Sequence, residues 1–196
     1  KKLEWKSTLD APDQETWNKI SDELKRLSNI RFKRYLEGYN ENTLSLHVFS
    51  DASAKAYEAA IYARYSVPDS SEIQTQLLFA KARVAPLTKL SIPRLELLAA
   101  LIATRILKYI RVALDTKNEI RSIIWSDSTV VLDWINSIHT LPTFVQNRVN
   151  EIKTSPFTEF HHVRGIDNPA DLPSRGISYN MLTNATIWWK GPKWLS

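Results

Sequence analysis

The stretch from Leu44 to Ser53 alternates apolar and polar residues, then ends in an acid followed by small residues. Leu44, Leu46 and Val48 recur at every second position, which is the period of a β-strand with one buried face. Asp51 stands where this strand pattern ends. A carboxylate buried there is costly on its own, so the rest of the chain is expected to supply partners for it.

After this strand, the sequence alternates between strand and helix periods. The expected elements are strands over about 57–66, 73–84, 122–125 and 157–163, and helices over about 91–114, from 128, after 142 and from 168. Ser91 and Pro93 suit the start of the long helix, and Asn168 is a natural N-cap for the last one. The order βββαβααβα predicts an α/β protein that opens with a meander of three strands.

Composition excludes several classes of protein. The 196 residues are 43% apolar and 24% charged, as in an ordinary globular protein. No run reaches the roughly 18 to 20 apolar residues that span a bilayer, and the N-terminus is not typical of a signal peptide. The absence of cysteine excludes disulfides, thiolate catalysis and zinc sites built on Cys. A net charge of +5 favours polyanions as partners, nucleic acid among them.

Residues 1–42 predict a helical connector that precedes the main domain. Trp17, Ile20, Leu24 and Leu27 recur at helical spacing, with Asp13 and Thr16 as candidate caps. The basic residues between 25 and 34 suit a solvated face, with contact to a phosphate backbone as the alternative. The polar stretch 37–42 marks a domain boundary.

Three further acids stand in apolar surroundings. Glu96 is the only charge in the helical segment 95–103, Asp127 follows a short apolar strand, and Asp171 lies in the last predicted helix. Each acid also has a plain structural interpretation. Glu96 would favour the helix dipole, Asp127 or Asp171 would cap a helix, and Asp51 would belong to a turn.

Taken together, the acids indicate a metal site. If the strands that end at Asp51 and Asp127 are parallel neighbours, their carboxylates lie about one strand spacing apart, roughly 5 Å. Such anions repel each other unless a cation lies between them. Oxygen ligands without Cys favour Mg²⁺ or Mn²⁺, and two such ions are a known means of phosphodiester hydrolysis.

Five motifs in this order resemble the ribonuclease H domain of retroelement reverse transcriptases, most closely that of BEL/Pao-type LTR retrotransposons. They are HVFSDAS at 47–53, KARVAPL at 81–87, IPRLELLAA at 92–100, WSDS at 125–128 and DNPADLPSRG at 167–176. The resemblance implies a ribonuclease H domain over 43–176, with a five-stranded mixed sheet, its first strand central, and helices on both faces. Residues 1–42 resemble the connection from the polymerase, and the Trp-rich segment 177–196 resembles the part that leads towards the integrase.

The resemblance also implies a site and an activity. Asp51, Glu96, Asp127 and Asp171 correspond to the family's catalytic acids, which hold two Mg²⁺ ions, for which Mn²⁺ can substitute. The implied reaction is hydrolysis of the RNA strand of an RNA/DNA hybrid, which leaves 5′-phosphate and 3′-hydroxyl ends. The implied partners are that hybrid and the polymerase domain of the same polyprotein. The implied location is intracellular, in a cytoplasmic virus-like particle or alternatively in the nucleus.

Two features depart from the family pattern. The segment 163–168 contains no histidine, although many members carry a histidine loop before the last acid, and the link 137–142 is too short for an additional basic helix. Contact with the hybrid is therefore expected from the polymerase or from residues near the acids. The candidates are Ser53, Lys89, Arg94, Arg105, Arg164 and Arg175.

Two other functions fit the same sequence. In the first, the domain is a catalytically weak or inactive module that holds nucleic acid or docks a protein. The four intact acids argue against such a loss of catalytic activity. A transposase or integrase core also groups acids at strand ends, but it normally lacks the early Ser-Asp-Ala-Ser followed by a helical Glu.

Overall fold

A computed structural model describes residues 4, 6–33, 35–36, 41–67, 72–114, 120–155 and 158–196. Most of the predicted break at 37–42, most of the predicted turn at 67–71 and the start of the last strand at Phe157 lie outside these residues. Within them the chain forms two compact units, residues 35–176 with 185–196, and residues 1–34 with 177–184. No helix among the described residues is long and apolar enough to cross a membrane.

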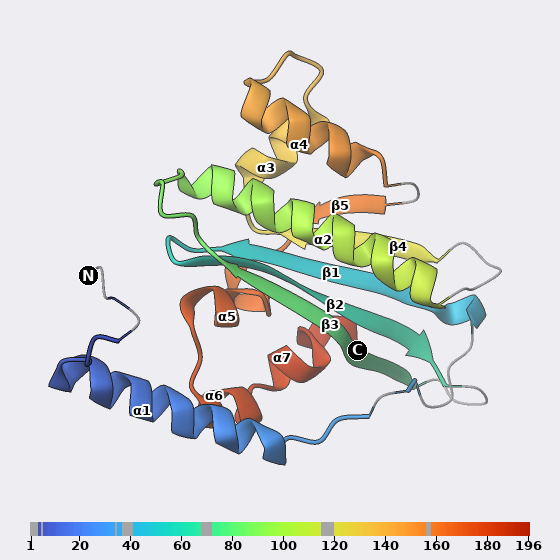
Figure 1. The fold of residues 1–196 in the computed structure, drawn as a ribbon. Coiled ribbons are helices and arrows are strands. Elements are labelled where there is room, and N and C mark those ends of the chain that lie inside the picture. Colours follow the sequence, from blue (N-terminus) through green and yellow to red (C-terminus); the bar gives the residue numbers. More distant parts are fainter. Residues whose placement is uncertain are drawn as a thin grey trace. The chain divides into compact units, whose positions relative to one another are not determined.

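The larger unit is built on a five-stranded mixed sheet (Figure 1). Its strands are β1 (Ser45–Ala52), β2 (Ala56–Ser66), β3 (Ile73–Val84), β4 (Arg121–Ser126) and β5 (Thr158–His162). They lie in the order β3-β2-β1-β4-β5, so β1 is central. The β1–β2 and β2–β3 pairs are antiparallel, whereas β1–β4 and β4–β5 are parallel. The predicted mixed sheet with a central first strand is therefore confirmed.

Helices cover both faces of this sheet (Figure 1). One face carries α2 (Ile92–Leu114), α3 (Thr129–Asn136) and α4 (Thr143–Lys153), and the other carries α5 (Asp171–Arg175) and α7 (Thr186–Lys190). Short 3₁₀ turns occupy Leu27–Asn29, Glu41–Thr43, Gly165–Asp167 and Lys193–Leu195. Residues 137–142 between α3 and α4 form no additional helix, as their length predicted.

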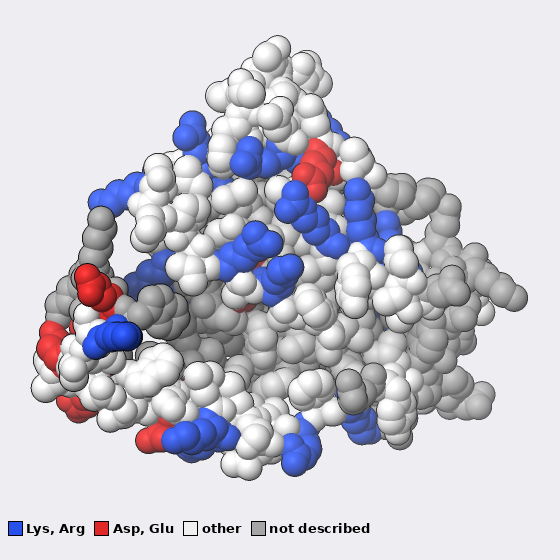
Figure 2. All heavy atoms as spheres, in the orientation of Figure 1, with Lys and Arg blue, Asp and Glu red and all other residues white. Residues whose placement is uncertain are grey.

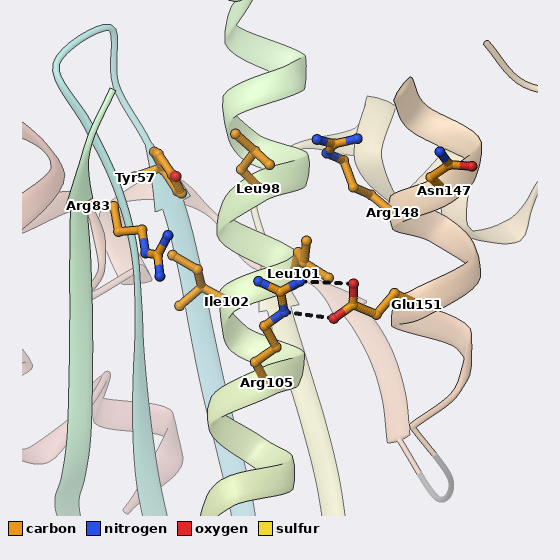
Figure 3. A pocket seen from close by; sticks show the side chains of 9 residues that line it. All are labelled: Tyr57, Arg83, Leu98, Leu101, Ile102, Arg105, Asn147, Arg148 and Glu151. Atoms are coloured by element: carbon orange, nitrogen blue, oxygen red, sulfur yellow. Dashed lines mark hydrogen bonds and ion pairs between the residues drawn. The ribbon is translucent and has the colours of Figure 1, made fainter. Parts of the chain in front are cut away.

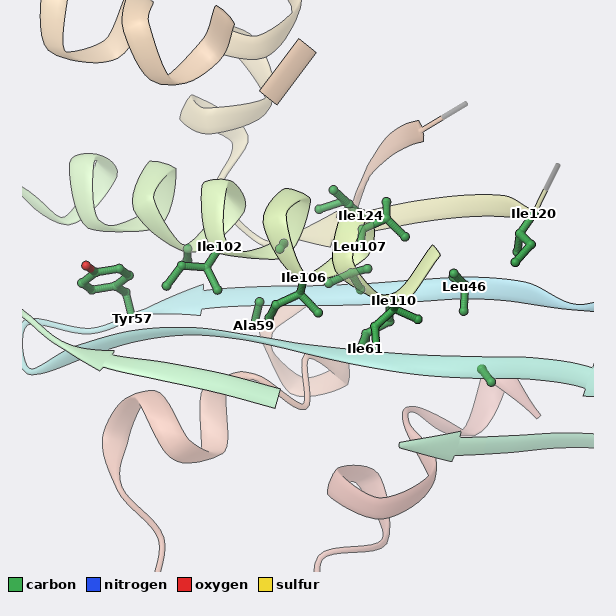
Figure 4. Packing of buried hydrophobic residues seen from close by; sticks show 14 of the residues in the cluster. Leu46, Tyr57, Ala59, Ile61, Ile102, Ile106, Leu107, Ile110, Ile120 and Ile124 are labelled. Atoms are coloured by element: carbon green, nitrogen blue, oxygen red, sulfur yellow. The ribbon is translucent and has the colours of Figure 1, made fainter. Parts of the chain in front are cut away.

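The main core lies between α2 and the strands β1 and β2 (Figure 4). Leu46 and Val48 point to this face and are fully buried, together with Leu107 of α2. Successive strand residues point to opposite faces, so Phe49 lies on the other side of the sheet. There its ring contacts Trp125 and Trp194, each with a centroid distance of 6.1 Å.

Residues 185–196 belong to the same compact unit as the sheet. The hydroxyl of Tyr62 donates to the carbonyl of Trp188 at 2.7 Å, and Arg64 Nε donates to the carbonyl of Leu195 at 2.8 Å. Side chains of the sheet thus satisfy carbonyl groups of this terminal segment. Its relation to an integrase stays a prediction.

The smaller unit pairs α1 (Ala11–Arg26) with α6 (Tyr179–Asn184). The guanidinium of Arg26 lies 4.1 Å from the centroid of the Tyr179 ring. The predicted helix is present, but the predicted cap was wrong. Asp10 is the N-cap, and its carboxylate accepts the backbone N–H of Asp13, because Pro12 already occupies the first turn.

The start of the last predicted helix in the main unit also needs correction. α5 begins at Asp171 rather than after Asn168, and no side chain caps it. The amide of Asn168 is engaged elsewhere: Nδ2 donates to the carbonyl of Ser50 at 3.0 Å, and Oδ1 accepts the N–H of Ala170. Asn168 therefore attaches this turn to the end of β1.

Candidate active site

Three of the four predicted acids meet at the carboxyl edge of β1 and β4. Asp51 is the seventh residue of β1, Glu96 is the fifth residue of α2, and Asp127 directly follows β4. One carboxylate oxygen from each lies within 4.8 Å of the others. The parallel register of Ser50 with Ser126 explains this, because it puts the next residue of each strand at the same level.

Burial and mutual repulsion raise the pKa of these carboxyls. The pKa of Asp51 rises to about 6, mainly through burial, and a hydrogen bond from Ser174 opposes the rise. Burial raises the pKa of Glu96 to about 9, with further contributions from Asp51 and Asp127. The pKa of Asp127 is raised as well, again chiefly by burial. The three carboxyls therefore resist carrying full charge together without a cation.

The donor set fits a hard divalent ion. Glu96 is only 7% exposed, and its Oε2 is buried with no hydrogen-bond partner among the described residues. Asp51, Glu96 and Asp127 offer oxygen ligands alone, which is the chemistry that Mg²⁺ and Mn²⁺ prefer. An ion among them would satisfy the free oxygen and offset the repulsion.

Asp171 lies near this group but is engaged by a cation of the protein. Its charge raises the pKa of Asp51, Glu96 and Asp127. However, its Oδ1 accepts a hydrogen bond from Arg175 Nε at 2.6 Å, one helical turn away. The structure thus brings three predicted acids together as candidate ligands and leaves the fourth paired with Arg175.

Ser174 links α5 to the end of β1, and the sequence did not single it out. Its buried hydroxyl donates to Asp51 Oδ2, and its carbonyl accepts from the hydroxyl of Ser53. These contacts join residues about 120 positions apart. A serine in a short polar helix carries no local signal of such a role.

Glu58 is a fifth acid beside the site, and the sequence did not indicate it. It is the antiparallel partner of Asp51 and is 1% exposed, with Oε1 lacking a hydrogen-bond partner among the described residues. Burial, with a smaller effect of Asp51, raises its pKa to about 9. Glu58 is therefore neutral at pH 7.

The predicted substrate-binding residues lie in varied places. Ser53 accepts the backbone N–H groups of Lys55 and Ala56 and so builds the β1–β2 turn. Lys89 is exposed just before α2, and Arg94 is exposed within its first turn.

The other three candidates are arginines engaged by acids. Arg105 pairs with both oxygens of Glu151, and Arg164 pairs with Asp167. The charge of Arg175 lowers the pKa of both Asp51 and Asp127. Substrate contact by these residues stays a prediction.

A basic pocket lies between the end of β3, α2 and the middle and later part of α4 (Figure 3). This Arg83–Arg148 pocket has a volume of about 280 Å³, and its lining residues are Tyr57, Arg83, Leu98, Leu101, Ile102, Arg105, Asn147, Arg148 and Glu151. Arg148 stacks on Phe144 with its guanidinium 3.5 Å from the ring centroid, and its buried Nε has no partner among the described residues. The pocket therefore combines three arginines beside the acid edge.

The comparison with protein families decides where this chain belongs. The model of the Pao retrotransposon-like RNaseH-like domain matches residues 1–128. The chain belongs to this family. The matched part of the Pao-family domain includes Asp51, Glu96 and Asp127, the three acids that meet in the structure, and ends before Asp171. A comparison with curated proteins finds no match.

Solved structures similar to the Pao-family domain include several ribonucleases H. RNase H1 from Halobacterium salinarum is 9% identical with a TM-score of 0.41, over 72% of this chain and 98% of that one. LC11-RNase H1, in complex with an RNA/DNA hybrid, is 15% identical with a TM-score of 0.41, over 65% and 91%. A foamy viral protease-reverse transcriptase with double-stranded DNA is 16% identical with a TM-score of 0.34, over 80% of this chain and 30% of that one. The fold assignment rests on the strand order and the family match.

Proposed function

We propose that this domain is an endonuclease that hydrolyses the RNA strand of RNA/DNA hybrids during reverse transcription of a retroelement, using two Mg²⁺ ions. The observation that carries the proposal is the convergence of Asp51, Glu96 and Asp127, with a buried Glu96 oxygen that has no hydrogen-bond partner in the described part of the chain. Family membership supplies the reaction class.

The four acids would share the task of holding the ions. Asp51, Glu96 and Asp127 are already close, and Asp171 would join them once Arg175 releases it. Mg²⁺ held by these residues would lower the pKa of a water and stabilise charge on the attacking and leaving oxygens. Ser174 would hold the Asp51 carboxylate in a fixed orientation through its hydrogen bond.

Basic side chains near the acids would position the substrate. The Arg83–Arg148 pocket adjoins Tyr57, which pairs with Ala52 next to Asp51. Its arginines suit phosphate oxygens, because guanidinium groups donate in a planar fork. Water would then attack the phosphorus and lose a proton, the bond to the 3′ oxygen would break, and that oxygen would take up a proton from solvent. The products are a 5′-phosphate end and a 3′-hydroxyl end.

A nucleic-acid-holding module with little or no catalytic activity is the second candidate. The pairing of Asp171 with Arg175 favours it, because a site that needs four free carboxylates would be incomplete in that state. Partnership with the polymerase domain and a location in a virus-like particle belong to either proposal and stay predictions.

A cleavage assay separates the two candidates. The full chain is incubated with end-labelled RNA/DNA hybrid, RNA duplex and DNA duplex in Mg²⁺ or Mn²⁺, alongside Asp51→Asn and the exposed-acid control Asp133→Asn. We expect cleavage of the hybrid alone, which Asp51→Asn abolishes and Asp133→Asn retains. If the hybrid stays intact even with the polymerase domain added in trans, the enzyme proposal fails. Cleavage that survives Asp51→Asn identifies a contaminating nuclease.

A further inference from the structure

A second groove continues from the Arg83–Arg148 pocket along α2, away from the acids. This Phe79–Tyr109 groove has a volume of about 290 Å³, and its lining residues are Phe79, Lys81, Arg83, Ile102, Arg105, Ile106 and Tyr109. It shares Arg83, Ile102 and Arg105 with the first pocket, so the two hollows are continuous.

The floor of the Phe79–Tyr109 groove is apolar and its rim is aromatic. Ile102 and Ile106 are only 6% and 4% exposed, whereas Phe79 is 39% and Tyr109 63% exposed. The two rings lie 6.0 Å apart between centroids, with their planes inclined by 50°. Large exposed rings beside each other offer flat faces on which another planar group can stack.

The charged side chains that line this groove are all positive. None of its described lining residues is acidic, and Lys81, Arg83 and Arg105 supply three cations. Arg105 is paired with Glu151, but neither the Lys81 nor the Arg83 side chain has a hydrogen-bond or ion-pair partner among the described residues. Figure 2 shows Lys and Arg side chains gathering across this face, over α2 and β3. The expected occupant is therefore an anion with planar groups.

The strand geometry connects this groove to the acid edge. Phe79, Lys81 and Arg83 alternate along β3, so they point to the same side as α2. Arg83 is opposite Tyr57, next to the Asp51 end of β1, and Phe79 lies four residues further back, about 13 Å at strand rise. A flexible polyanion that leaves the acids at the Arg83 end can follow the groove towards Tyr109.

We propose that the Phe79–Tyr109 groove binds an unpaired nucleic-acid segment that continues from the strand held at the acid edge. Bases stack on the exposed aromatic rings, while Lys81 and Arg83 contact the backbone phosphates. Unpaired segments suit this site better than duplex, because the faces of bases are free to stack only when the strand is unpaired. The inference rests on the proposed function only for the continuity with the catalytic strand.

Binding of single-stranded RNA in EDTA tests the groove without requiring cleavage. The affinity of the full chain for a labelled oligouridine is measured by fluorescence anisotropy over a range of salt concentrations. We expect Tyr109→Ala to weaken binding about fivefold or more and Tyr109→Phe to retain it, because stacking needs the ring and not the hydroxyl. Lys81→Ala should lower the slope of log affinity against log salt by about 0.7, for one lost phosphate contact.

Two matched controls lie on the same helix. Val112→Ala removes an exposed apolar side chain outside the groove, and Lys108→Ala removes a cation that donates to Thr154 instead. Both should leave RNA affinity unchanged. The proposal is overturned if Tyr109→Ala binds oligouridine as tightly as the wild type does. It is also overturned if this substitution weakens the binding of a fully paired hybrid as much as that of oligouridine. It is also overturned if polyglutamate binds the groove and oligouridine does not. If the wild-type chain binds single-stranded RNA but does not cleave the hybrid, only the nuclease proposal fails.

Discussion

Asp51 on β1 and Glu58 on β2 are antiparallel partners, and both carboxyl side chains are buried. Paired residues of this kind project from the same face of a sheet, so the two acids are neighbours. The site therefore has an additional carboxyl on the β2 side, opposite the side on which Asp127 lies.

Glu58→Gln is expected to stabilise the fold in EDTA. The pKa of Glu58 is raised from 4.5 to about 9 by burial, so between these pH values the folded state holds a proton that the unfolded state releases. Stability is therefore lost as pH rises through this window, by about 3 kcal/mol at pH 7 but under about 1 kcal/mol at pH 5. Urea unfolding should show a larger gain at pH 8 than at pH 5. An equal gain at both pH values would contradict the assignment.

His47→Gln should flatten the acid limb of the stability curve. Burial first, then Arg64 and Arg121, lower the pKa of His47 from 6.5 to about 4, and its Nδ1 accepts from the Trp125 indole at 3.1 Å. The unfolded state binds the proton more readily, so the folded state loses up to about 3 kcal/mol as pH falls from 6.5 to 4. Melting curves across this range test the slope. His139→Gln, which changes an exposed histidine, should keep the wild-type slope.

Mn²⁺ should raise the melting temperature through the acid cluster. Binding at a hundredfold excess over the dissociation constant stabilises a fold by about 2.7 kcal/mol. Glu96→Gln should lose most of this effect, whereas Asp133→Asn, outside the cluster, should retain it. In EDTA the Glu96→Gln variant should melt no lower than the wild type, because a buried carboxyl with a raised pKa has been replaced. A full Mn²⁺ response in Glu96→Gln would show that the ion binds elsewhere.

Arg175→Gln should strengthen Mn²⁺ binding. Arg175 donates a hydrogen bond to Asp171, and its charge lowers the pKa of Asp51. Its substitution therefore frees the Asp171 carboxylate as a ligand and removes a cation that competes with Mn²⁺. The Arg175 side chain is 73% exposed, which limits the gain to about fivefold in affinity. Isothermal titration with Mn²⁺ measures it. Arg164→Gln breaks a similar pair with Asp167 and should change nothing; an equal effect of both variants would indicate net charge rather than release of Asp171.

Ser174→Ala should move Mn²⁺ binding to higher pH. The Ser174 hydroxyl holds down the pKa of Asp51, so its loss lets that pKa rise further above its ordinary value. The affinity for Mn²⁺ at pH 6 should then fall more than the affinity at pH 8. Ser50→Ala is the matched control, because this buried hydroxyl donates to the Trp125 carbonyl instead. A uniform loss at both pH values would point to general disorder of the site.

Much of the sheet could be predicted because its signals are local. The period of two in β1 and the limits of β3 at Ile73 and Val84 agree with the structure. Asp51 and Asp127 could be expected together, since each ends an apolar strand and parallel strands end at one edge. The start of α5 could not, because Asn168 suits a helix cap equally well in isolation.

The sequence by itself determined the order of strands and helices, the family and the four candidate acids, three of which converge in the structure. These follow from hydrophobic periodicity and from short motifs, which act over a few residues. Only the tertiary structure decided that Glu58 is buried beside Asp51, that Ser174 holds Asp51, and that Asp171 pairs with Arg175. The first two depend on strand register and on contacts across more than 100 residues, and the third on which way one exposed side chain turns. No local pattern encodes any of them.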